Sequence, residues 1–161
     1  MIVVSNTSPI INLAAVGHLN LLQQLYKEIT IPEAVYREIV VVGPGQPGSH
    51  EVETASWIKS RKVSNQTSIA LMEIELERGE AEAIALAAEL SADLLLLDER
   101  RARRMASRLG LRYIGVLGVL VEAKNRGHLK AVKPVLEVLI TQAGFWVSTD
   151  LYTRVIEVAG E

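Results

Sequence analysis

Carboxylate side chains are concentrated in one part of this chain. Of its 19 Asp and Glu residues, nine lie between Glu73 and Glu99, where Arg78 is the single basic residue. Carboxylates gathered without Cys or His suit hard cations such as Mg²⁺ or Mn²⁺, which serve phosphoryl chemistry by activating water and neutralising charge. The nine acids are Glu73, Glu75, Glu77, Glu80, Glu82, Glu89, Asp93, Asp98 and Glu99.

A basic segment follows directly. Its arginines, at positions 100, 101, 103, 104 and 108, would cover roughly 160° of one helix face at about 100° per residue. Such a row can hold phosphate groups, and it is equally typical of a solvated helix surface. Because the chain carries a net charge of −2, it has no global positive field, and any contact with nucleic acid must be local.

The acids also have structural interpretations. Glu80 and Glu82 stand in the first turn of an expected helix, where the macrodipole favours negative charge. Asp98 is a good N-cap for the helix that follows it, and Asn6, Thr7 and Ser8 are good capping and turn residues. A solvated helix face is the simpler interpretation of Glu73, Glu75 and Glu77.

The elements that must position these residues can be read from hydrophobic patterning. Short apolar runs predict strands at 1–4, 57–63, 93–97 and 112–114. Helical spacing predicts helices at 10–26 with a break at Gly17, at 33–40, 79–90 and 99–109, and two more between 115 and 144. Strands that alternate with helices predict an α/β/α sandwich around a central parallel sheet. At 161 residues, of which 49% are hydrophobic, a single domain over 1–161 is expected, with C-terminal helices from about 115.

Parallel sheets of this kind bind ligands beyond the carboxyl ends of their strands. That rule selects two places, Ser5–Ser8 after the first strand and Asp98–Glu99 after the run DLLLL. A receiver-like signalling domain also ends a strand with an acid, but it needs an acid pair where this chain has SNTS. We therefore disfavour that alternative.

Composition excludes several classes of chemistry. The absence of cysteine rules out disulfides, thiol nucleophiles and Cys-ligated metals, and it fits a reducing cytoplasm. No apolar run approaches the roughly 20 residues of a membrane span, so we expect a cytoplasmic protein without membrane contact. Trp57, Phe145 and Trp146 are expected to pack in the core rather than to stack on bases.

Four segments together resemble a known family. VVSNTSPI, IPEAVYREI, GEAEAIALA and ADLLLLDERRARRMA look, in this order, like the PIN-domain superfamily and its VapC-like branch of bacterial and archaeal proteins, from Met1 to about Gly127. The resemblance implies a three-layer fold and an endoribonuclease that depends on Mg²⁺ or Mn²⁺ and acts on single-stranded or looped RNA. Many relatives are toxins and many are homodimers, so RNA, a cognate antitoxin protein and a second copy are the expected partners.

The resemblance also assigns residues. The four acidic positions of the family fall on Asn6, Glu38, Glu82 and Asp98, which are expected to bind the metal and to carry catalysis. Glu80 and Glu99 are near alternatives. The expected substrate-binding residues are Thr7, Ser8, Arg100, Arg101 and Arg104.

Asn6 departs from the pattern. An asparagine keeps a carbonyl oxygen that can bind Mg²⁺, but it removes one negative charge, so metal affinity should fall. Two functions therefore compete. One is a metal-dependent ribonuclease, and the other is a catalytically impaired module that binds RNA or a protein.

Overall fold

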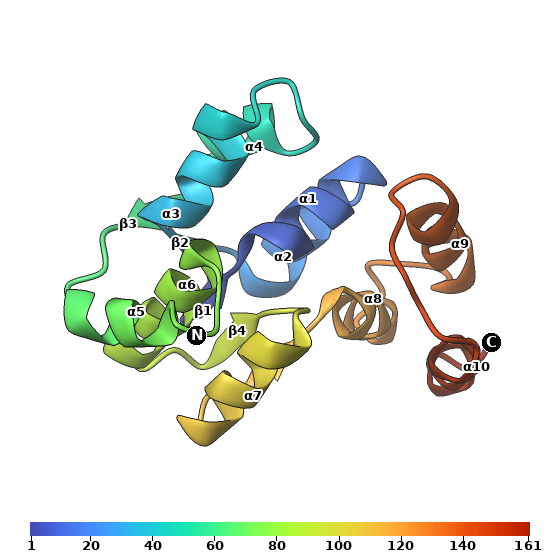
Figure 1. The fold of residues 1–161 in the computed structure, drawn as a ribbon. Helices are drawn as coiled ribbons and strands as arrows, with labels where there is room; N and C mark the ends of the chain where they lie inside the picture. Colours follow the sequence, from blue (N-terminus) through green and yellow to red (C-terminus); the bar gives the residue numbers. More distant parts are fainter.

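A computed structural model describes residues 1–161 and contains one parallel sheet of five strands in the order β3-β2-β1-β4-β5 (Figure 1). The strands are β1 (Val3–Ser5), β2 (Ile29–Pro32), β3 (Ile58–Arg61), β4 (Leu94–Leu96) and β5 (Tyr113–Ile114). This order differs from the 2-1-3-4-5 order of flavodoxin-like domains. It therefore removes the receiver-like alternative and confirms the predicted parallel sheet.

Helices cover both faces of the sheet. They are α1 (Thr7–Ala15), α2 (Asn20–Tyr26), α3 (Glu33–Tyr36), the π-helix η1 (Arg37–Val42), α4 (Ser49–Thr54), α5 (Gln66–Met72), α6 (Arg78–Glu89), α7 (Arg100–Arg108), α8 (Val116–Asn125), α9 (Lys133–Thr141) and α10 (Thr149–Val158). In Figure 1, α8, α9 and α10 lie together at the side of the molecule opposite to β3 and α5. None of these helices has the length and apolar character needed to cross a membrane.

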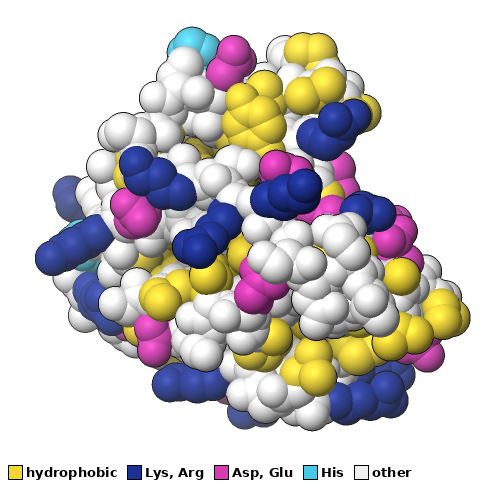
Figure 2. All heavy atoms as spheres, turned by 90° about the vertical axis from the view of Figure 1, so that its left-hand side faces the viewer, with side chains coloured by type: hydrophobic (Ala, Val, Ile, Leu, Met, Phe, Trp, Pro, Cys, Tyr) yellow, Lys and Arg dark blue, Asp and Glu magenta, His cyan; other side chains and the backbone are white.

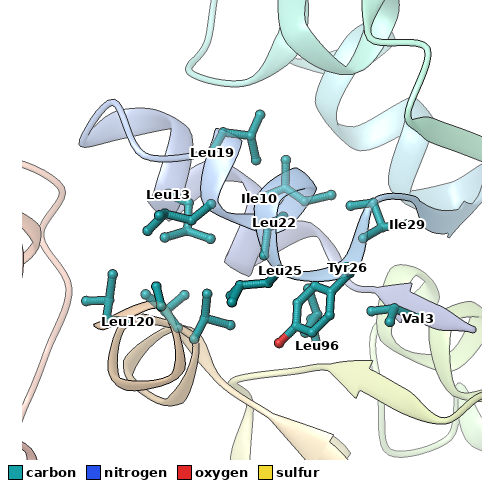
Figure 3. Close-up of a cluster of buried hydrophobic side chains, with 14 of the residues drawn as sticks. Val3, Ile10, Leu13, Leu19, Leu22, Leu25, Tyr26, Ile29, Leu96 and Leu120 are labelled. Atoms are coloured by element: carbon teal, nitrogen blue, oxygen red, sulfur yellow. The ribbon is translucent and has the colours of Figure 1, made fainter. Parts of the chain in front are cut away.

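Two hydrophobic cores sandwich the sheet, because successive strand residues point to opposite faces. Val3 and Leu96 belong to the larger core, which they share with α1, α2 and α8 (Figure 3). Val4 and Leu95 point the other way, into a second core formed with α5, α6 and α7. The predicted three-layer α/β/α architecture is confirmed.

Several elements differ from the sequence prediction. The segment Ile29–Pro32 is a full strand, and α4, α5 and α10 are helices that hydrophobic spacing did not predict. The break at Gly17 is confirmed, since this residue has a φ of 74° that favours glycine. Helix α10 did have a local signal, because the Ser148 hydroxyl accepts a hydrogen bond from the Leu151 amide as an N-cap.

Glu161 ties the end of the chain to α8 and α9. Its carboxylate accepts hydrogen bonds from the amides of Val132 (2.6 Å) and Lys133 (3.1 Å), at the start of α9. It also pairs with the Lys124 ammonium of α8 at 3.0 Å. The Val132 amide, followed by Lys124, lowers the pKa of Glu161 from 4.5 to about 2.

This lowered pKa predicts a stability effect that depends on pH. A carboxylate whose pKa is depressed in the folded state stabilises that state above its unfolded pKa, and the contribution disappears as the pH falls toward the folded value. Glu161→Gln should therefore lower the thermal midpoint at pH 7, and the difference from wild type should shrink between pH 5 and pH 3, as followed by circular dichroism. Glu157→Gln, at an exposed position of α10, is the matched control. A difference that stays constant over this range would contradict the assignment.

Candidate active site

Asn6 and Asp98 follow the two central strands. Ser5 pairs with Leu96 in the β1–β4 register, and the Asn6 amide N–H donates to the Leu96 carbonyl at 3.0 Å. Asn6 is only 6% exposed, yet its side chain makes no capping bond to α1. No buried side-chain polar atom lacks a partner, so the free Asn6 amide group must touch the surface. The predicted edge of the sheet therefore carries an available oxygen at Asn6.

Glu38 is joined to this edge by Thr7 and Gly79. The Thr7 hydroxyl, in the first turn of α1, donates to Glu38 Oε2 at 2.5 Å. The Glu38 carboxylate lies so close to Gly79 that a Cβ at that position would collide with it. Glu38 itself lies on η1, and π-helical turns are frequent at functional sites. The Thr7 hydroxyl of α1 thus holds the carboxylate of η1, and Gly79 of α6 leaves room for it.

Asp98 is held by the start of α8. The Val116 amide donates to both of its carboxylate oxygens, at 3.2 and 3.3 Å, and Gly115 leaves room for this approach because it has no Cβ. Burial raises the pKa of Asp98 above its ordinary value, against the opposing effects of the Val116 amide and the Arg103 guanidinium. The alternative that Asp98 caps the helix directly after it is wrong, since it serves α8 instead of α7.

Arg103 is a site residue that sequence reasoning missed. Its Nε donates to the Leu97 carbonyl at 2.8 Å, and its Nη2 lies 3.7 Å from Asp98 Oδ1. Its guanidinium also lies over the Tyr113 ring, 5.0 Å from the centroid. These three contacts fix a positive charge beside Asp98. The five arginines of this segment look alike in the sequence, so only the packing of α7 distinguishes Arg103.

Glu82 is occupied by two partners within the chain. It is 6% exposed, and its carboxylate accepts from the Ala34 amide at 3.2 Å and from Arg78 Nε at 2.8 Å. The first of these bonds caps α3, whose own N-cap residue, Pro32, has no polar side chain. Glu82 therefore joins α6 to α3.

Glu80 has a different environment. One of its oxygens accepts from the Glu77 amide at 3.0 Å, as in a capping box. Burial raises the pKa of Glu80, and the charges of Glu77, Glu99 and Glu38 raise it further. The Glu77 amide bond opposes this rise, and Glu80 lies within the electrostatic reach of Glu38 and Glu99.

The remaining predicted residues lie in three places. Ser8 is half-buried beside Thr7 in the first turn of α1. Arg100 lines a groove that also contains Asp98 and Glu99. Arg101 and Arg104 line another pocket, so the structure does not place all three expected substrate-binding arginines together.

The groove beside Asp98 has a volume of about 760 Å³ and runs between α7, α8 and α10. Arg154 and Trp146 also line it. The expectation that Trp146 packs in the core is wrong, because this side chain is 81% exposed. Trp57 and Phe145 do pack against the larger core. Trp146 lies in the irregular segment between α9 and α10.

A sequence model of a family described as a PIN domain matches residues 2–161. The chain belongs to the PIN domain family. PIN domains are generally nucleases, and the five-stranded parallel sheet of this chain is a nuclease-type fold. No curated protein matches the chain.

The donors at the edge of this PIN domain fit a hard divalent cation in chemical type. Asn6, Glu38, Glu80 and Asp98 offer only oxygen atoms, which are the ligands that Mg²⁺ and Mn²⁺ prefer. Their present spacing is open, because no three Asp, Glu or His side chains lie close enough together to hold one ion. Thr7 holds Glu38, and Val116 and Arg103 hold Asp98.

The bond between Thr7 and Glu38 leads to a prediction. Thr7→Val preserves the branched shape and removes the only donor to Glu38 Oε2, so the free energy of unfolding should fall by about 1.5 kcal/mol, as for hydrogen bonds to charged groups. Thr7→Ser keeps the hydroxyl and should retain most of that stability. Urea denaturation measures both variants. Equal losses in the two variants would show that the hydrogen bond does not hold Glu38.

Proposed function

We propose that this PIN domain is a metal-dependent endoribonuclease that uses Glu38, Glu80 and Asp98 together with the amide oxygen of Asn6. The observation that supports this proposal is that Asn6 and Asp98 follow the paired strands β1 and β4 at the carboxyl end of the sheet, and that Thr7, next to Asn6, donates to Glu38. Open parallel sheets bind their ligands at this end.

Glu80 is preferred to Glu82 on the evidence of their contacts. Both oxygens of Glu82 are engaged, one by the Ala34 amide and the other by the exposed Arg78 guanidinium. If Glu82 bound a metal instead, the Ala34 amide would lose this partner. Glu80 keeps one oxygen free of hydrogen bonds and feels the charges of Glu38 and Glu99. Burial is the main cause of the raised pKa of Glu80, and a cation nearby would offset the smaller part that comes from the charges of Glu77, Glu99 and Glu38.

The chain's own residues provide positioning. When bound, Mg²⁺ or Mn²⁺ would supply an activated water and neutralise charge on the scissile phosphate. Thr7 orients Glu38, while the Val116 amide and Arg103 orient Asp98. Arg100 and Arg154, in the groove beside Asp98, would pair with backbone phosphates.

Single-stranded or looped RNA is the proposed substrate. The exposed Trp146 ring lies in the same groove and gives an unpaired base a surface on which to stack. A-form duplexes bury their base faces, so only unpaired bases can use this surface.

The partners follow from the resemblance to the VapC-like branch. We propose that the chain is the toxin of a toxin–antitoxin pair, that a cognate antitoxin protein binds it, and that it forms a homodimer. Several large apolar side chains are exposed and would be available for contact with a partner. The most exposed are Trp146, Ile74, Val42 and Met1.

The proposed function predicts different effects at the two neighbouring acids of α6. Cleavage of an unstructured RNA should require Mn²⁺ or Mg²⁺ and stop on addition of EDTA. Glu80→Gln should lower kcat by roughly 100-fold or more, since even outer-shell partners of a metal site cost 10–100-fold. Glu82→Gln should instead lower the thermal midpoint, while its folded fraction still cleaves. Cleavage that survives EDTA would contradict this assignment. So would an active Glu80→Gln variant together with a folded Glu82→Gln variant that does not cleave.

A catalytically impaired binding module is the second candidate function. The uncharged amide of Asn6 and the open spacing of the acids favour it.

Asn6→Asp separates the two candidates. If the wild type is an enzyme, both proteins cleave RNA and the variant needs at least about tenfold less Mn²⁺ for half-maximal activity, because a charged ligand replaces a neutral one. If only the variant cleaves, the wild type is the binding module. The absence of metal-dependent cleavage in both proteins would contradict the proposed enzyme.

A further inference from the structure

Helix α7 presents its arginines on two sides. Arg100 and Arg103 line the groove beside Asp98. The other three line a second pocket of about 390 Å³, bordered by Ile74 and Glu75 from the segment between α5 and α6. We call this second site the three-arginine pocket, and it is lined by Ile74, Glu75, Arg101, Arg104, Met105 and Arg108.

The three guanidinium groups of this pocket have no partner in the chain. Arg101, Arg104 and Arg108 are exposed, and they form no ion pair with Glu75, the one acidic residue of the lining, or with any other carboxylate. Their spacing of three and four residues places them on one side of the helix, over roughly 10 Å at 1.5 Å per residue. Like charges at this spacing destabilise a helix, so stability does not explain the row. The presence of an anionic ligand would explain the three arginines.

The lining of the pocket favours a phosphate chain with attached bases. Arginine forks pair with phosphate in a bidentate manner, which a row of three can repeat along a backbone. Ile74 is 80% exposed, and Leu71 nearby in sequence is 65% exposed, so apolar surface adjoins the charges. An unpaired base has a flat face that can cover such a surface.

Basic and acidic side chains are interspersed on the side of the molecule that carries β3 and α5 (Figure 2). The chain as a whole is slightly acidic, with a net charge of −2. The concentration of three unpaired arginines is therefore local.

We propose that the three-arginine pocket binds the sugar-phosphate backbone of a single RNA strand, outside the groove that holds Asp98. The pocket would contact the RNA backbone on the side of α7 away from Asp98. The protein would therefore recognise a longer stretch of the strand. This inference rests on the proposed function for the identity of the nucleic acid as RNA, and it requires no cleavage.

Fluorescence anisotropy of a labelled, unstructured 12-nucleotide RNA tests this site in EDTA with the full chain. The variant R101Q/R104Q/R108Q is compared with K59Q/R61Q/K62Q, which removes the same charge from exposed side chains of β3 and the residue after it. In the pocket variant, the Kd for the RNA should rise at least about tenfold. The slope of log affinity against log salt should become shallower by about 2, because each of three lost phosphate contacts accounts for ~0.7. The control should leave the slope unchanged. Thermal midpoints no lower than that of wild type show that both variants are folded.

Competitors distinguish the source of the anion. Orthophosphate should displace the RNA only at far higher concentration than unlabelled RNA, and polyglutamate of equal charge should not displace it. Displacement by polyglutamate as readily as by RNA would assign the pocket to an acidic protein and overturn the inference. Equal losses of RNA affinity in the pocket variant and in the control would also overturn the inference. An unchanged salt slope in the pocket variant would do the same.

Cleavage is measured separately in Mn²⁺. A wild type that binds RNA through the pocket but never cleaves it would overturn the proposed enzyme and leave this inference standing. A wild type that cleaves RNA, beside a pocket variant that binds RNA normally, would overturn this inference alone.

Discussion

The pairing of β1 with β4 is the constraint on which the site depends. Ser5 lies opposite Leu96, so Asn6 and Asp98 leave neighbouring strands at the same edge of the sheet. Strand residues alternate between two separate cores, and a slip of one residue would send Val4 and Leu95 into the wrong core and turn the site residues away. Hydrophobic packing on both faces thus fixes the position of the polar groups that follow the strands.

The amide of Asn6 changes the electrostatics of this edge. Glu80 already feels the charges of Glu38 and Glu99, and a carboxylate at position 6 would bring one more negative charge to the carboxyl ends of the strands. The asparagine avoids that repulsion while the metal is absent, because it has an oxygen donor but no charge. It therefore favours the ligand-free protein and weakens the attraction for a cation.

Elements with strong local signals were predictable, and tertiary contacts were not. The run DLLLL and the helix after it place Asp98 correctly, because apolar runs and helical periodicity are local properties. Glu38 was reached only through the family resemblance, since its hydrogen bond to Thr7 spans 31 residues. The contrast between Glu80 and Glu82 arises from the packing of α6 against α3. Trp146 is exposed in an irregular segment between two helices. Helix spacing alone indicates none of these.

The central claim is that Asn6, Glu38, Glu80 and Asp98 form one cation site despite the missing acid. A crystal of the wild-type protein soaked in MnCl₂ and measured at the manganese absorption edge tests it most directly. We predict an anomalous peak at the carboxyl end of β1 and β4, with Glu80 and Asp98 as ligands and with Glu82 still bound to Ala34 and Arg78. An anomalous map without a peak at this edge, at a Mn²⁺ concentration that supports cleavage, would contradict the account.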